Sequence, residues 1–417
     1  MMRNLNFNTL LIASLLIAYF SFGWGRILPY FSLSAILVLV AFVISIAKKR
    51  DFSFHKISII SLGIALILLF LMMLVNDFNQ PFSRVRDFSI IFIIFTVFYE
   101  FFKNENENNL NLIFKLIIIY LCLSSLVAVF QTFNFNFAWD LRTYLPATQD
   151  LTINNQIDNR LRPTGLSYYS VQLGYQLLFG FVMIDVASKN NSFIRKHLLK
   201  FYLAMVLGGI FGANLSLLFA IIVYLSMRYF LSNSRISYTS LFFITSVSIL
   251  IIFSPVFERL LVTDDSALSR LTFLYIGTEI LMAFPFGVSY KEIYEIKLAA
   301  LNNIDLGELP FSINFLDTSF HNTFLTLGIE TGWIGLIAYI IFYAYLLRFY
   351  LKNTAEGNLK LRQIYLIGFS ANLAYLVQLV THNAGPFHSD PYFWMMNGIL
   401  IGYCEFLKKE SHGNHSI

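Results

Sequence analysis

Cysteine and charge are both scarce in this chain of 417 residues. Only 2 cysteines are present, and charged residues make up 13% of the sequence. Two cysteines cannot build a disulfide framework or a cysteine-rich metal site. So little charge, against 57% hydrophobic residues, cannot cover the surface of a soluble protein of this size. The composition excludes the common soluble classes and indicates a membrane protein.

The sequence also lacks a basic domain that could bind nucleic acid. Its net charge is +5, but Lys and Arg occur in short clusters between apolar segments. Such clusters are typical of membrane topology, because Lys and Arg collect in cytoplasmic loops. We therefore expect membrane lipids, and no nucleic acid, as partners.

Long apolar segments occupy most of the chain. A helix of about 20 residues crosses a hydrocarbon layer of about 30 Å. The segments predict an all-α, polytopic integral membrane protein with about twelve transmembrane helices in a single domain over residues 1–417. Only a glycine-rich break separates the seventh helix from the eighth, so one long span is the alternative there. The expected helices cover residues 9–23, 27–47, 57–75, 88–102, 110–131, 167–187, 198–211, 214–231, 237–254, 320–350, 361–382 and 391–407.

The distribution of basic residues predicts the orientation. With both termini in the cytoplasm, 19 of the 29 Lys and Arg residues fall on the inner side. Of the 10 outer ones, 8 are arginine, whose planar donors suit bidentate binding of phosphate or carboxylate. We therefore expect the functional site on the outer face.

Two outer loops, over residues 132–166 and 255–319, are longer than ordinary connections. Loops of this length are usually functional or disordered, and the aromatic and apolar residues of the first loop argue against disorder there. In the second loop, Asp264, Asp265 and Ser266 can cap a helix that ends before Pro285. This pattern predicts an amphipathic, interfacial helix over residues 267–284.

The first loop ends in RLRPTG at residues 160–165, just before a helix expected to begin near Ser167. The first amides of a helix lack intrahelical partners and its dipole favours anions there. Arg160 and Arg162 beside that helix end predict an anion site. The alternative is that the segment is only a turn whose arginines reach lipid headgroups.

A histidine lies at the start of the helix expected over 320–350. Either Asp317 or Ser319 can cap this helix, which would place His321 in or near its first turn. There the dipole would lower the imidazole pKa and favour a neutral general base. The alternative is an ordinary interfacial histidine.

Glu330 lies nine residues further along, among Gly328, Gly332 and Gly335. In a regular helix this spacing puts it opposite His321, so we do not expect a dyad. The glycines predict close helix packing, and the carboxylate is either functional or structural. His382 and His388 fall on the same outer side without acidic or cysteine partners at ligand spacing, so we expect no metal site.

These motifs match a known family in order and spacing. RPTG at 162–165, Ser269-Arg270 followed by FPFG at 284–287, and HNTFL at 321–325 leading into ETGWIG at 330–335 resemble the O-antigen ligase and polymerase superfamily. The likeness covers roughly residues 160–400. Its most specific part is the His-Asn stretch that leads into the Glu-x-Gly-x-x-Gly helix.

The resemblance implies a metal-independent, inverting glycosyltransferase without a cofactor, on the periplasmic face of a bacterial inner membrane. Its donor would be an undecaprenyl-diphosphate-linked oligosaccharide, held by Arg162 and Arg270, with His321 as the catalytic base. The family often has a Ser-Arg or Thr-Arg pair at the start of helix eight, where this chain reads GANLS over 212–216. Either Arg160 or Asn214 takes that place, or the donor site differs from that of the family. The supporting positions would be Gly165, Asn322, Gly287 and Glu330.

The family includes polymerases, which join a growing chain to another lipid-linked repeat unit, and ligases, which move the chain to lipid A core. We expect a polymerase, with an acceptor glycan and a chain-length regulator as partners, and keep the ligase as the alternative. A transporter or flippase is the less favoured reading. Such proteins usually show internal symmetry and ionisable residues at the midplane, whereas here the loop over 255–319 has no counterpart in the first half.

Overall fold

The apolar segments fold as helices, which satisfy their own backbone hydrogen bonds without water. A computed structural model describes residues 6–21, 32–48, 54–76, 79–143, 156–157, 160–161, 163–167, 170–212, 214–231, 265–303, 320–355, 358–382, 385–387 and 390–413. The helices are α1 (Phe7–Ser21), α2 (Leu33–Lys48), α3 (Lys56–Val75), α4 (Asn79–Asn104), α5 (Glu107–Thr132), α6 (Asn136–Thr143), α7 (Ser170–Ser188), α8 (Ser192–Lys196), α9 (Leu198–Phe211), α10 (Leu215–Leu231), α13 (Asp265–Ala283), α14 (Ile293–Asn303), α15 (Thr323–Asn353), α16 (Leu359–Thr381) and α17 (Pro391–Gly413). Two short strands, β1 (Gln156–Ile157) and β2 (Arg160–Leu161), form an antiparallel pair.

Eleven of the twelve predicted helices coincide with helices of the structure, and the predicted helix over 237–254 lies outside the described residues. The seventh and eighth predicted helices are the separate helices α9 and α10. Five helices, α3, α5, α7, α15 and α16, are long and apolar enough to cross a membrane, and α1, α2, α9, α10 and part of α13 are shorter apolar helices. The all-helical membrane-protein class is therefore confirmed, while the count of twelve spans and their sidedness stay predictions.

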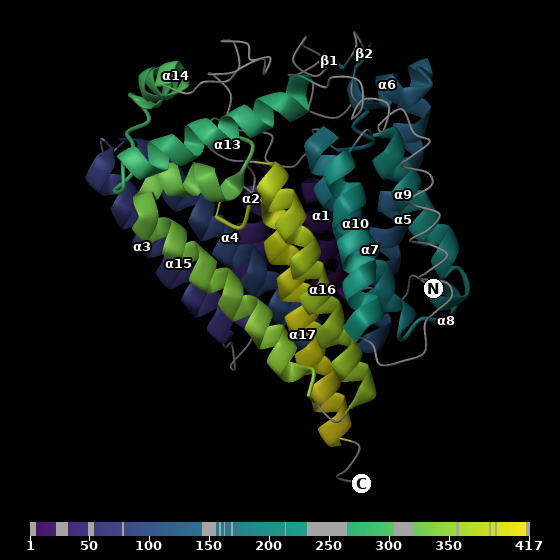
Figure 1. Cartoon of the computed structure of the whole chain (residues 1–417). Coiled ribbons are helices and arrows are strands. Elements are labelled where there is room, and N and C mark those ends of the chain that lie inside the picture. The colour runs from purple at the N-terminus through teal and green to yellow at the C-terminus, as the bar shows by residue number, and fades with distance from the viewer. Residues whose placement is uncertain are drawn as a thin grey trace.

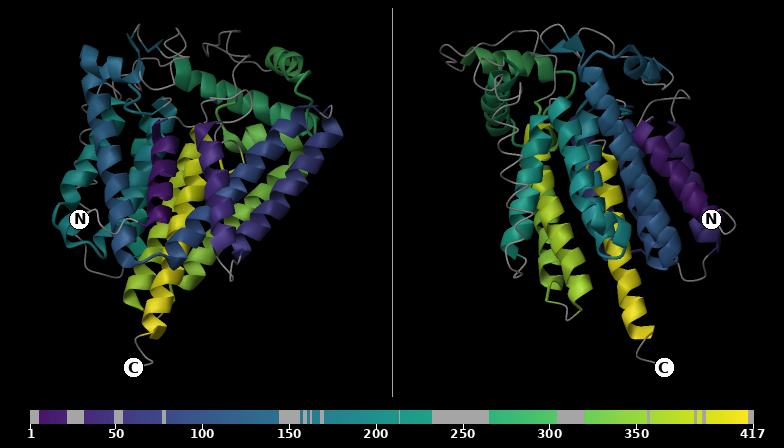
Figure 2. Two further views of the ribbon diagram at one scale, coloured as in Figure 1. Left: turned by 180° about the vertical axis from the view of Figure 1, so that it is seen from behind. Right: turned by 90° about the vertical axis from the view of Figure 1, so that its right-hand side faces the viewer.

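The long helices form a bundle, and the loop elements gather at one end of it. Figure 1 shows α6, the β1–β2 pair, α13 and α14 together at this end, while α17 reaches furthest at the opposite end. The two views in Figure 2 show the same arrangement. We call the end that carries α6, α13 and α14 the capped end. The two long loops of the sequence therefore contribute to one end of the molecule.

The helix predicted over 267–284 is α13, which lies across the capped end (Figure 1). Phe273, Ile276 and Ile280 are buried at helical spacing. They form a small core with Val288 and Phe320, and residues of α14 pack against it. The predicted helix is therefore present and ends before Pro285, while its interfacial position stays a prediction.

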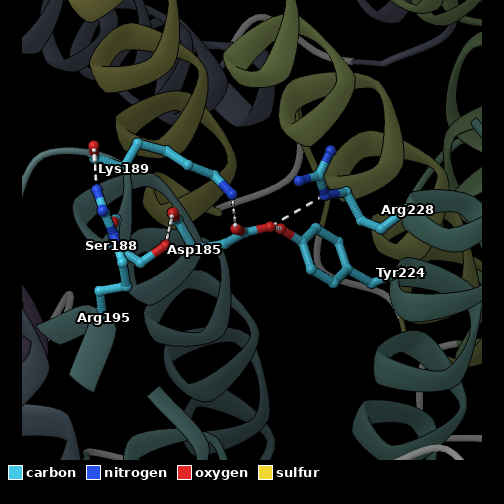
Figure 3. Close-up of polar contacts among 6 residues, drawn as sticks. All are labelled: Asp185, Ser188, Lys189, Arg195, Tyr224 and Arg228. Atoms are coloured by element: carbon cyan, nitrogen blue, oxygen red, sulfur yellow. Dashed lines mark hydrogen bonds and ion pairs between the residues drawn. The ribbon is translucent and has the colours of Figure 1, made fainter. Parts of the chain in front are cut away.

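A charged cluster joins α7 to α10 in the last turn of α7 (Figure 3). Asp185 forms ion pairs with Lys189 (3.1 Å) and Arg228 (3.0 Å) and accepts a hydrogen bond from the Tyr224 hydroxyl (2.8 Å). Figure 3 shows the two cations approaching the carboxylate from different sides. Asp185 lies about 22 Å along α7 from the residues that follow the RPTG motif, at a rise of about 1.5 Å per residue. The two cations neutralise the buried carboxylate of Asp185, so the cluster is a fixed contact between α7 and α10.

Two asparagines connect α15, α16 and α17 inside the bundle. The Asn372 amide donates to Asn397 Oδ1 (3.0 Å), the Asn397 amide donates to Asn372 Oδ1 (3.2 Å), and the Tyr350 hydroxyl also donates to Asn397 Oδ1 (2.8 Å). Each of the three side chains is at most 1% exposed. Buried polar groups of this kind stabilise a fold only while their partners are present.

We predict that Asn397→Ala lowers the free energy of unfolding by about 1–3 kcal/mol, because it leaves Asn372 and Tyr350 buried without these partners. Denaturant or thermal unfolding of the purified protein in detergent measures this. Asn353→Ala, at the end of α15, serves as the control and should change stability much less. Equal stability of Asn397→Ala and the wild type would contradict this role of the amide pair.

Candidate functional site

The histidine motif forms the entry to α15, and its capping residue differs from the prediction. The helix begins at Thr323, and Asn322 is its N-cap, accepting from the Leu325 amide at 3.1 Å. Asp317 and Ser319, the predicted caps, lie outside the described residues. His321 therefore precedes the cap and lies next to the first turn, as predicted, while the capping residue is Asn322 and neither of the two predicted candidates.

His321 has an unusual backbone conformation. Its φ is +49°, one of two positive values among the non-glycine residues described. The left-handed conformation costs roughly 1–2 kcal/mol for such a residue, and strain of this kind is common at functional sites. The ring centroid of His321 is 6.3 Å from that of Phe273 on α13. The candidate base is thus held against the helix that carries position 270.

Arg270 lies in α13, one helical turn before Phe273. The structure describes its backbone, whereas its side chain lies outside the described part. The fold therefore brings the Ser269-Arg270 motif and the histidine motif together, as the resemblance implies, through the contact between Phe273 and His321.

The FPFG motif fills a break in α15. Gly332 has φ +70° and interrupts the helix. At the break, the Trp333 amide donates to Pro285 O (2.9 Å), and the Val288 amide donates to Ile329 O (2.8 Å). A Cβ on Gly332 would lie 2.6 Å from the Phe286 carbonyl carbon, so only glycine fits. Gly332 is thus a break in the helix, where the sequence had predicted a helix-packing glycine.

Gly287 makes the matching close approach from the loop. Its φ is +98°, and an added Cβ would lie 3.1 Å from Glu330 O and from Gly332 N. Two motifs more than forty residues apart in the sequence are therefore two halves of one backbone contact. Because α15 starts after His321, the two residues do not belong to one regular helix. The spacing argument that placed Glu330 on the face opposite His321 therefore does not apply.

Glu330 forms a buried ion pair with a residue that the sequence motifs did not include. Arg84 Nη2, on α4, lies 2.7 Å from Glu330 Oε1 and donates to the Tyr290 hydroxyl at 3.1 Å. The Tyr290 amide donates to Asn76 Oδ1, the C-cap of α3, at 2.9 Å. Burial, and then the nearby Glu330 carboxylate, raise the pKa of Tyr290. The pair fastens the segment after FPFG to α3, α4 and α15.

The RPTG turn is built on a buried glutamine of α5. Gln131 Oε1 accepts from the amides of Thr164 (2.8 Å) and Gly165 (2.9 Å), and its amide donates to Ala138 O (3.0 Å). Ser124 Oγ accepts from the Leu166 amide at 3.0 Å. Nothing in the sequence marked Gln131 for this task. It fixes the turn that immediately follows position 162.

This geometry changes the anion site predicted from the helix end. The amides of residues 164–166 are occupied by Gln131 and Ser124, and the Ser167 amide donates to Thr164 O. The described part of helix α7 begins at Ser170, three residues after Ser167. Anion binding here would therefore depend on the arginines. Arg162 lies outside the described residues, and Arg160 is described only as backbone, paired with Ile157.

A lysine missed by the sequence motifs lies beside the histidine motif. Lys297 of α14 is 5% exposed, and its Nζ is 4.6 Å from the Phe320 ring centroid and 5.9 Å from that of Phe273. Cations are attracted to aromatic faces at these distances. The sequence held a signal for it, because Lys297 interrupts the apolar spacing of Ile293, Ile296, Ala300 and Leu301. The ammonium places a positive charge next to the residue before His321.

The turn between α16 and α17 contributes two further buried groups. His382, the C-cap of α16, contacts Ser216 and Thr323. Asp390 accepts from the Tyr392 amide through Oδ1 (2.9 Å), and its Oδ2 has no hydrogen-bond partner among the described residues. Burial raises the pKa of Asp390 to about 7, although its backbone hydrogen bonds act in the opposite direction.

Asn214, the residue considered as a replacement for the family arginine, has a capping role. Its Oδ1 accepts from the Leu217 amide (3.1 Å) and from Ser216 Oγ (2.9 Å) at the start of α10. Its side-chain oxygen is therefore committed to the helix end. Within the part of the chain that the structure describes, no group of three or more His, Cys, Asp or Glu residues could hold a metal ion.

No protein-family model matches the chain, and no curated protein matches it at a significant level.

We predict that Glu330→Gln lowers the free energy of unfolding by about 3 kcal/mol, because it removes the carboxylate that forms the 2.7 Å ion pair with the largely buried Arg84 guanidinium. Unfolding in detergent measures the loss. Glu279→Gln, at an exposed position of α13, is the matched control and should be neutral. Wild-type stability of Glu330→Gln would show that the ion pair does not hold this end together.

We predict that Asp390→Asn alters how stability depends on pH. The raised pKa means that the folded protein keeps a proton on Asp390 that the unfolded chain releases above about pH 4. The wild type should therefore lose stability as pH rises from about 4 to 7, and the variant should lack this component.

Melting midpoints of both proteins between pH 4.5 and 8 provide the test, with the exposed Asp140→Asn as control. The melting midpoint of Asp390→Asn should increase relative to that of the wild type as pH rises. Parallel pH curves for the two proteins would contradict the assignment.

Proposed function

We propose that this protein is a membrane glycosyltransferase of the O-antigen polymerase type, with its site at the capped end. The observation that carries the proposal is the junction of α13, the FPFG loop and the start of α15, which brings His321 next to the helix of Arg270. The resemblance gives roles to these motifs, and the contacts among them support it. The periplasmic face of a bacterial inner membrane is the location that the resemblance implies.

In the proposed reaction, the neutral imidazole of His321 accepts the proton of an acceptor sugar hydroxyl. The hydroxyl oxygen forms a bond to the anomeric carbon of the donor on the face opposite the diphosphate, so the configuration inverts. The bond between that carbon and the diphosphate oxygen breaks, and its electron pair leaves with undecaprenyl diphosphate. No cofactor takes part.

The leaving group develops negative charge, which fixed cations stabilise. Arg162 and Arg270 are the proposed contacts to the diphosphate, since guanidinium groups bind phosphate oxygens in pairs. Lys297 adds a positive charge beside the histidine motif. These groups supply the role for which other transferases use a metal ion.

The buried carboxylates count against a transporter. Coupled transport commonly uses intramembrane acids that change partner or protonation. Here Glu330 is paired with Arg84, and Asp185 with Lys189 and Arg228. Both pairs join helices at their ends, which suits fixed structural contacts.

We predict that His321→Ala, Arg162→Ala and Arg270→Ala each reduce polymer formation by about 100-fold or more, the usual effect of removing an acid–base or charge-stabilising group. Purified full-length protein receives a lipid-linked repeat unit, and the product ladder is resolved on a gel. His197→Ala and Arg142→Ala are the matched controls.

A ladder from the repeat unit alone supports a polymerase. Product that forms only when lipid A core is added would replace the polymerase with the ligase. Wild-type chain length in all three variants, at normal protein levels, would rule out the proposed site.

A further inference from the structure

His382 begins the turn between α16 and α17 and lies where three helix ends meet. Its side chain is 8% exposed, and its ring packs edge-on against Tyr175 of α7, with centroids 5.9 Å apart. Its amide donates to Gln378 O at 2.9 Å, which fixes it to the last turn of α16. Because it is buried and fixed by these contacts, His382 can hold the helix ends around it in a constant position.

The hydrogen bond to α10 has a defined direction. Ser216 Oγ donates its one proton to Asn214 Oδ1 at 2.9 Å. It can therefore only accept in its 2.7 Å contact with His382 Nε2, which must carry the hydrogen. The chemistry of the serine thus sets the proton on Nε2, and His382 is attached to the cap of α10.

The same residue is attached to the histidine motif through its backbone. Thr323 Oγ1 donates to His382 O at 2.9 Å. Thr323 is the first residue of α15, two positions after His321. A continuous chain of hydrogen bonds therefore runs from Asn214 through Ser216, His382 and Thr323 to the segment that carries the candidate base.

The chain connects two places that matter for the proposed reaction. One end is the start of α10, where the resembling family often has an arginine that this protein lacks. The other end is the left-handed turn of His321. Reaction rates fall steeply when a catalytic group moves by about 1 Å, so the anchoring of this turn bears on the rate.

We propose that His382 is a positioning residue that holds His321 in register with the start of α10, an inference that rests on the proposed function. Its imidazole does not contact the reacting atoms. It acts through Thr323, the first residue of α15, whose hydroxyl donates to the His382 carbonyl. The sequence alone assigned no role to His382.

The test compares kcat and KM for polymer formation by the full-length protein in detergent. His382→Ala should lower kcat roughly tenfold or more, with KM for the lipid-linked donor changed by less than about twofold, because placement and not donor binding is lost. His382→Gln keeps a side-chain N–H donor and should recover most of the rate. His197 is the control histidine, because it contacts Phe193 and takes no part in the hydrogen-bonded chain that contains His382. His197→Ala should behave as the wild type.

A double-mutant cycle separates positioning from general destabilisation. Ser216→Ala and Thr323→Val interrupt the same chain on either side of His382. The double variant should therefore lose little more rate than either single variant. Independent losses that multiply would contradict a single continuous chain.

Other results would overturn the proposal. Wild-type kcat in His382→Ala, a change in KM alone, or no recovery in His382→Gln would each do so. If His321→Ala is inactive while His382→Ala is fully active, this inference fails and the proposed function stands. If His321→Ala is itself fully active, both fail.

Discussion

The break in α15 is the constraint on which the capped end depends. Backbone groups removed from water cost several kcal/mol if they lack partners. The interruption at Gly332 leaves the Trp333 amide and the Ile329 carbonyl without helical partners. Pro285 O and the Val288 amide supply them from another part of the chain. The loop after α13 is therefore bound to α15 by a requirement of the backbone, with side chains in a supporting role.

The remaining contacts follow from this attachment. Once the loop over 285–288 is fixed, α13 before it must lie across the bundle, and Phe273 reaches His321. Just after the loop, the Tyr290 hydroxyl accepts a hydrogen bond from Arg84. The ion pair of Arg84 with Glu330 joins α4 to α15 next to the break. From the other side, Gln131 holds the turn after position 162, and His382 links α10 to α15. Segments distant in the sequence are thus joined at the break in α15 and at the start of this helix.

The helix positions and the ends of α13 could be predicted from the sequence, because apolar length, capping residues and Pro285 are local signals. The cap of α15 could not. Asp317, Ser319 and Asn322 all have side chains that can cap a helix, so the local sequence does not distinguish them, and the structure shows Asn322 in that role. Gly332 was equally ambiguous, since a glycine within an apolar helix usually indicates packing, and only the FPFG loop reveals a break. Gln131 and Arg84 carried no local signal, whereas Lys297 did, through its place in an apolar stripe.

The most direct test of the account is a structure of the full-length protein with undecaprenyl diphosphate bound. Diphosphate density is expected at the capped end, between the start of α13 and the RPTG turn, within reach of Arg162 and Arg270 and facing His321. Density at the opposite end of α7, near Asp185 and Arg228, or no binding at the capped end at saturating ligand, would contradict it.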